Sequence, residues 1–90
     1  MEEWYREASM LLDKARRLRG DEIVALRYFI ENVSVGTLRA EMDLSRKGVS
    51  EPKRVIEKLV ELGLLEKGEY SYSLSLPLRM LRARRGSIKI

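Results

Sequence analysis

The chain has 90 residues, 44% hydrophobic and 36% charged, and this length suits one small globular domain with a modest core. It contains no cysteine and no histidine, which excludes disulfides, thiol nucleophiles, zinc fingers and imidazole bases. The net charge of +4 is compatible with binding to a polyanion, and equally with an ordinary solvated surface.

The sequence carries no membrane or export signal. No run of about 18 apolar residues is present. The first residues, Met1-Glu2-Glu3-Trp4, are acidic where a signal peptide would be basic. We therefore expect a cytoplasmic protein with no membrane partner. The many Glu, Lys and Arg residues, with a single Asn and no Gln, are typical of thermophile proteins.

The first element expected is a helix over residues 2–19 that Gly20 ends. Its apolar residues recur every three or four positions and form one stripe, which consists of Trp4, Ala8, Leu11, Ala15 and Leu18. Such a stripe packs either on its own domain or on another helix. These five residues are therefore the candidate contacts with a second copy of the chain or with a protein partner.

Three more helices are expected before Gly63. Asp21 is the candidate N-cap of a helix over 22–32, whose inner face consists of Ile23, Leu26, Ile30 and Val33, with Phe29 beside them. Ser34 is the candidate cap of a short helix that runs through Met42. Proline is tolerated in a first turn, so Pro52 opens the last of these helices. Its inner face consists of Val55, Ile56, Leu59 and Leu62, and its outer face exposes Lys53, Arg54, Glu57, Lys58 and Glu61.

Beyond these helices the hydrophobic period changes from about 3.6 to 2, which predicts a β-hairpin with a tight turn at Gly68-Glu69. One strand face carries Tyr70, Tyr72, Leu74 and Leu76. Aromatic strand residues can stack on single-stranded bases, but continuation into leucines favours core packing. Pro77 then opens a basic helix over 77–85, and residues 88–90 are expected to add a strand or to fray.

This order of elements resembles a known fold family. Leu59-Val60-Glu61-Leu62-Gly63-Leu64-Leu65-Glu66-Lys67, followed by Tyr72-Ser73-Leu74, is similar to the end of the recognition helix and the wing of archaeal and bacterial winged helix-turn-helix regulators. Residues 34–40 resemble the start of that family's second helix. The resemblance covers residues 21–76. It implies one mainly α domain over 1–90 with a small β-hairpin, an extra N-terminal helix over 1–19 and a basic C-terminal tail over 77–90.

The resemblance also implies which residues would contact nucleic acid. The helix from Ser50 to Leu62 would enter the major groove of double-stranded DNA, with Ser50, Lys53 and Arg54 nearest the bases. Lys58 would reach a phosphate, and Arg46 and Lys47 would lie in the turn beside the backbone. A second basic cluster, with Lys89 beside it, can clamp a phosphate backbone or simply keep the tail solvated. That cluster consists of Arg79, Arg82, Arg84 and Arg85.

The sequence thus predicts a DNA-binding transcriptional regulator that acts as a homodimer. The alternative is a winged-helix protein-interaction module or accessory subunit of a replication, transcription or nucleic-acid-processing assembly. The short wing, with two acids against one base at 66–69, and the N-terminal stripe favour that alternative. RNA or a single strand is a third partner that the sequence allows. No residues form a catalytic, cofactor-binding or metal-ligating pattern, so no enzyme, cofactor or metal is expected.

Overall fold

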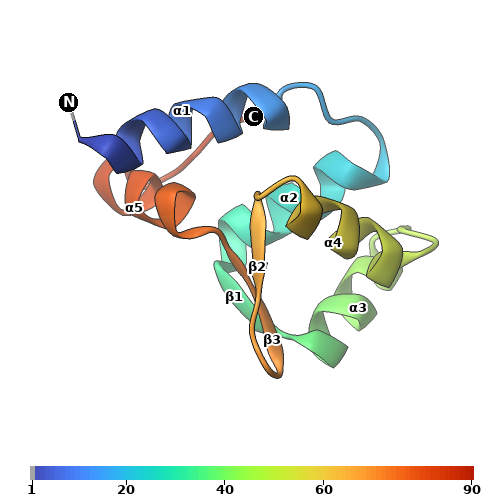
Figure 1. The fold of residues 1–90 in the computed structure, drawn as a ribbon. Helices are drawn as coiled ribbons and strands as arrows, with labels where there is room; N and C mark the ends of the chain where they lie inside the picture. The colour runs from blue at the N-terminus through green and yellow to red at the C-terminus, as the bar shows by residue number, and fades with distance from the viewer. Residues whose placement is uncertain (1) are drawn as a thin grey trace.

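The computed structural model describes residues 2–90, which form five helices and one three-stranded sheet (Figure 1). In chain order the elements are α1 (Glu3–Ala15), α2 (Asp21–Asn32), β1 (Ser34–Gly36), α3 (Thr37–Arg46), α4 (Pro52–Glu61), β2 (Leu65–Lys67), β3 (Ser71–Leu74) and α5 (Leu76–Arg85). None of the helices within residues 2–90 is long and apolar enough to cross a membrane.

The sheet is antiparallel, and β3 is its central strand, with β1 on one side and β2 on the other. Val35 pairs with Tyr72 in one ladder, and Leu65 pairs with Leu74 in the other. The order of α2, β1, α3, α4 and the β2–β3 hairpin is compatible with a winged helix. The mainly helical fold with a small hairpin is therefore confirmed.

The segment from Ser34 to Gly36 is a strand, so the prediction that Ser34 caps a helix was wrong. Its partner strand, β3, lies more than thirty residues further along the chain, and no local sequence pattern predicts a pairing over that separation. The helix that follows begins at Thr37 and continues past Met42 to Arg46. The longer helix buries Leu44 one turn after the buried Ala40, which explains why it does not stop earlier.

Both ends of the chain also differ from expectation. Helix α1 ends at Ala15 rather than at residue 19, and Gly20 adopts a φ of 58° directly before α2. A positive φ is open to glycine without steric penalty, so Gly20 turns the chain into the next helix. At the other end residues 88–90 form no strand, and Ile88 is buried against the core.

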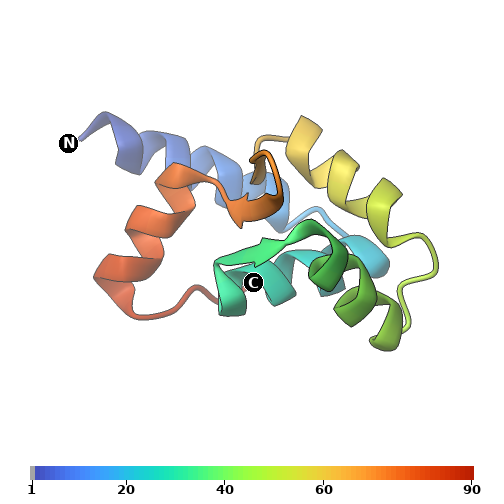
Figure 2. The ribbon, with the colours of Figure 1, turned by 90° about the horizontal axis from the view of Figure 1, so that it is seen from below.

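The core is built around Phe29, which is fully buried on α2. Its ring meets Tyr28 and Tyr72 edge to face, with centroid distances of 5.1 and 6.4 Å. Around it the fully buried residues come from every layer, and they include Leu26, Leu44, Ile56, Leu59, Leu64 and Leu74. The helices α1 and α5 pack against each other, and Figure 2 shows them on the side of the molecule away from α3 and α4.

Candidate interaction surface

The structure exposes the residues that were predicted to read DNA from α4. Ser50 lies in the turn before this helix, and Lys53, Arg54 and Lys58 project to solvent along its first two turns. Arg46 is the last residue of α3 rather than a turn residue, and Lys47 follows it at the helix end. Their exposure agrees with the sequence prediction, but exposure alone does not indicate which partner they meet.

Carboxylates are interleaved with these bases. A shallow groove between α2 and α4 is lined by Glu22, Glu51, Arg54, Val55, Glu57, Lys58 and Glu61. Four acids therefore face two bases, and Arg54 already lies 3.7 Å from Glu51. Affinity for a phosphate backbone comes mainly from uncompensated cations. This side of α4 is consequently a poor surface for a polyanion.

Two carboxylates also lie near the part of the sheet that is next to α4. Burial raises the pKa of Tyr72, and the nearby charges of Glu41 and Glu57 raise it further. Glu41 belongs to α3 and Glu57 to α4, so carboxylates from both helices lie near the central strand of the sheet. A duplex held between a recognition helix and a wing would have to approach these two acids.

Each of the four arginines of α5 has a contact within the molecule, although Arg84 and Arg85 are also exposed. Arg82 donates from Nε to the carbonyl of Ile30 at 2.6 Å and from Nη2 to the carbonyl of Glu31 at 3.4 Å. Both carbonyls belong to the last turn of α2, where a cation also favours the helix dipole. Arg82 thus fastens α5 to the C-terminal end of α2.

The other end of α5 is held by Glu66 of β2. One carboxylate oxygen of Glu66 accepts from the backbone N–H of Leu76 at 2.8 Å, which caps the first turn of the helix. The second oxygen accepts from Arg79 at 3.0 Å. Glu66, one of the acids that make the wing unfavourable for DNA, therefore stabilises the start of α5.

The last two arginines of the cluster contact α1. Arg84 lies 5.4 Å from the ring centroid of Trp4 and 3.8 Å from Glu2, and Arg85 donates to the hydroxyl of Tyr5 at 3.1 Å. These contacts stack α5 on the first helix. The four arginines that were predicted to contact phosphates therefore also contact three neighbouring elements, α1, α2 and β2. The basic composition of the tail did not reveal these contacts.

The N-terminal stripe packs mainly within its own domain. Ala8, Ala15 and Leu18 are buried, whereas Trp4 and Leu11 are half-buried. In this structure Ala8, Ala15 and Leu18 are therefore not accessible to another molecule. A contact with a second copy or a partner stays a prediction for Trp4 and Leu11.

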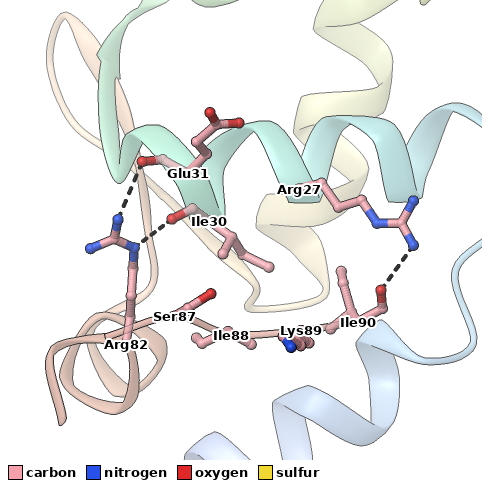
Figure 3. Close-up of a pocket in the computed structure, with 8 residues that line it drawn as sticks. All are labelled: Arg27, Ile30, Glu31, Arg82, Ser87, Ile88, Lys89 and Ile90. Carbon is pink, nitrogen blue, oxygen red and sulfur yellow. Dashed lines mark hydrogen bonds between the residues drawn. The ribbon is translucent and has the colours of Figure 1, made fainter. Parts of the chain in front are cut away.

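A cavity of about 530 Å³ lies between α2 and the C-terminal segment (Figure 3). Arg27 and Arg82 border it from either side, and each donates a hydrogen bond across the seam. Arg27 reaches the carbonyl of Ile90 at 2.8 Å, which holds residues 88–90 against α2. The remaining lining mixes the apolar Ile30, Ile88 and Ile90 with Glu31, Ser87 and Lys89. The two arginine bonds make this region a seam between α2 and the C-terminal segment.

Five large apolar side chains are exposed among residues 2–90, and they fall into two groups. Leu38 and Met42 of α3 are 75% and 54% exposed, and Tyr70 in the loop between β2 and β3 is 77% exposed. We call these three residues the α3–wing patch. Met10 and Leu76, at 64% and 51%, lie beside a groove between α1, β2 and the start of α5. Tyr70 and Leu76 were predicted to lie on a core face, whereas only Tyr72 and Leu74 of that face are buried.

One buried tyrosine gives this region a pH-dependent contact. The hydroxyl of Tyr28 donates to Asp43 of α3 at 2.5 Å. Burial, this hydrogen bond and the charge of Asp43 raise the pKa of Tyr28 to about 12. Because the folded protein holds the neutral phenol more strongly than the unfolded chain does, the stabilisation is complete below about pH 10. It should disappear as the pH rises from about 10 to 12.

This pH dependence can be measured by following phenolate absorbance during an alkaline titration. We expect Tyr28→Phe to remove a component with a midpoint near 12 and to flatten the loss of stability above pH 10. Tyr70→Phe is the matched control, because Tyr70 is exposed. If Tyr28→Phe removed a component with a midpoint near 10, the contact with Asp43 would not be formed in solution.

Comparison with known proteins identifies the family. A family model described as PBP2, PolB1 Binding Protein 2, matches residues 19–80. A comparison with curated proteins finds no match. The matched range extends from the turn before α2 into α5 and covers more than half of the chain, including all of the winged helix-like core. The chain therefore belongs to the PolB1 Binding Protein 2 family.

Proposed function

We propose that this protein binds the DNA polymerase PolB1 as an accessory subunit and catalyses nothing itself. The family match carries the proposal, since its description names PolB1 as the bound protein. This is the protein-interaction alternative that the short acidic wing favoured in the sequence. Duplex DNA and transcription regulation, which the sequence placed first, gain no support from the match.

Charge placement supports the same conclusion. The arginines of α5 are engaged with α1, α2 and β2, and the groove beside α4 holds more acids than bases. A surface with mixed charge and exposed apolar side chains is typical of a protein contact, where aromatic residues and Met are enriched. A DNA-binding surface is instead strongly positive.

The proposal is tested by isothermal titration of the purified chain into purified PolB1, with size-exclusion chromatography of the mixture. We expect a defined complex with a micromolar or tighter Kd, of the order found for standard-size interfaces. In parallel, fluorescence anisotropy with a labelled random duplex should show weaker binding. Absence of a complex with PolB1, together with tight duplex binding, would reinstate the DNA hypothesis.

A charge-reversal variant tests directly whether α4 binds duplex DNA. Arg54→Glu with Lys58→Glu reverses two exposed charges on α4 without touching the core. If α4 contributes little to polyanion binding, duplex affinity should change less than threefold. A loss of more than about tenfold, with a flatter salt dependence, would mean that α4 does contact phosphates.

A further inference from the structure

The α3–wing patch combines two elements into one rigid surface. Leu38 and Met42 lie one turn apart on α3, so their side chains are neighbours on its outer face. Tyr70 is brought to the start of that helix because the N–H of Thr37 donates to its carbonyl at 3.0 Å. Figure 1 shows the tip of the β2–β3 hairpin beside the beginning of α3.

The hairpin tip is held in place before any partner arrives. Gly68 donates its N–H to the carbonyl of Ser71 at 2.7 Å, which closes the loop that carries Tyr70. Binding would therefore order few groups, and preorganisation of this kind favours affinity. Exposed apolar residues that occur singly are normal on a protein surface, but three large ones brought to the same region by the Thr37–Tyr70 bond are a candidate interaction site.

The charges around the patch indicate what kind of surface covers it. Arg46 lies one turn beyond Met42 on the same line of α3 and is well exposed. Arg39 and Arg46 share a single carboxylate, that of Asp43, at 3.7 and 4.0 Å. Asp43 also accepts from Tyr28, so the positive charge at the Arg39–Arg46 edge of α3 is incompletely compensated, whereas the hairpin edge of the patch carries the exposed acid Glu69.

We propose that the α3–wing patch docks on PolB1 and that its counterpart there is an apolar depression bordered by carboxylates. The inference rests on the proposed function and specifies the surface that performs it. An apolar counterpart would cover Leu38, Met42 and Tyr70, and acidic residues at its edge would pair with Arg39 and Arg46. A duplex offers phosphates to the arginines but would leave the three apolar side chains in water.

The decisive experiment compares two double variants in titrations against purified PolB1. Leu38→Glu with Tyr70→Glu places charge in the patch, and we expect a loss of at least thirtyfold, typical of an interface centre. Met10→Glu with Leu76→Glu is the control, because it places the same two charges on two other large exposed apolar residues, beside the other groove. Its affinity should stay within about threefold of the wild type.

Charge complementarity is tested separately with Arg46→Glu. We expect this variant to weaken binding about tenfold and to reduce its dependence on salt. Circular dichroism of every variant should show a wild-type spectrum, since the changed side chains are exposed.

The outcomes distinguish the inference from the proposed function. If the wild-type chain binds PolB1 and Leu38→Glu with Tyr70→Glu binds equally well, this surface is not the docking site, although the proposed function stands. The inference also fails if the same variant only converts a dimer into a monomer, or only lowers duplex affinity, with PolB1 binding unchanged. If the wild-type chain does not bind PolB1 at all, the proposed function itself is wrong.

Discussion

Replacing Phe29 with alanine is expected to remove most of the stability of this domain. Phe29 is 0% exposed and lies between the rings of Tyr28 and Tyr72. Truncating a buried phenylalanine typically lowers the free energy of unfolding by about 3–5 kcal/mol, because packing is lost and a cavity remains. A domain this small has a total stability near the lower end of about 5–15 kcal/mol. Urea denaturation followed by circular dichroism measures the loss.

Two controls make this result interpretable. Phe29→Leu retains most of the buried volume and should lose clearly less stability. Leu38→Ala removes a large but 75% exposed side chain, so the free energy of unfolding should change by less than about 0.5 kcal/mol. A loss below about 1 kcal/mol for Phe29→Ala would show that the three aromatic rings do not form the centre of the core.

Replacing Arg82 with alanine is expected to have the next largest effect. The change removes the two hydrogen bonds to the end of α2 and leaves the carbonyl of Ile30 without its donor. Hydrogen bonds from charged groups contribute about 1.5–3 kcal/mol, and the helix dipole adds to this. The melting temperature should fall by on the order of 10 °C, which thermal denaturation measures.

Arg84→Ala is the matched control on the same helix. Its side chain is 67% exposed and contacts Trp4 and Glu2 at the surface, where solvent weakens ion pairs. We expect a small decrease in melting temperature, well below that of Arg82→Ala. Equal effects of the two substitutions would mean that the positive charge of α5, rather than the bond to α2, stabilises the fold.

The contacts of Arg82 and the other arginines of α5 also bear on function. A helix with four arginines and no acid has the composition of a nucleic-acid contact. In the structure the same arginines anchor α5 to three neighbours, and three of the five large exposed apolar residues lie on α3 and the hairpin loop. The surface that remains therefore suits a protein partner better than a phosphate backbone.

Much of the fold could be predicted from local patterns. The inner faces of α2 and α4 were predicted from their period, and Leu26, Phe29, Ile56 and Leu59 are fully buried. The hairpin was predicted from the change of period near Gly63, and its buried residues Tyr72 and Leu74 alternate as expected. Helical and strand periodicities reflect which side of an element faces the core, so a short window of residues contains the information.

The candidate site depended on contacts between distant segments. The pairing of β1 with β3, the acceptors of Arg79 and Arg82, and the approach of Tyr70 to Thr37 each join residues far apart in the chain. No periodicity encodes such partners, because they arise only when the elements pack. The sequence by itself determined the helices, the hairpin and the basic composition. Only the tertiary structure decided which charges are used internally and which apolar side chains remain exposed.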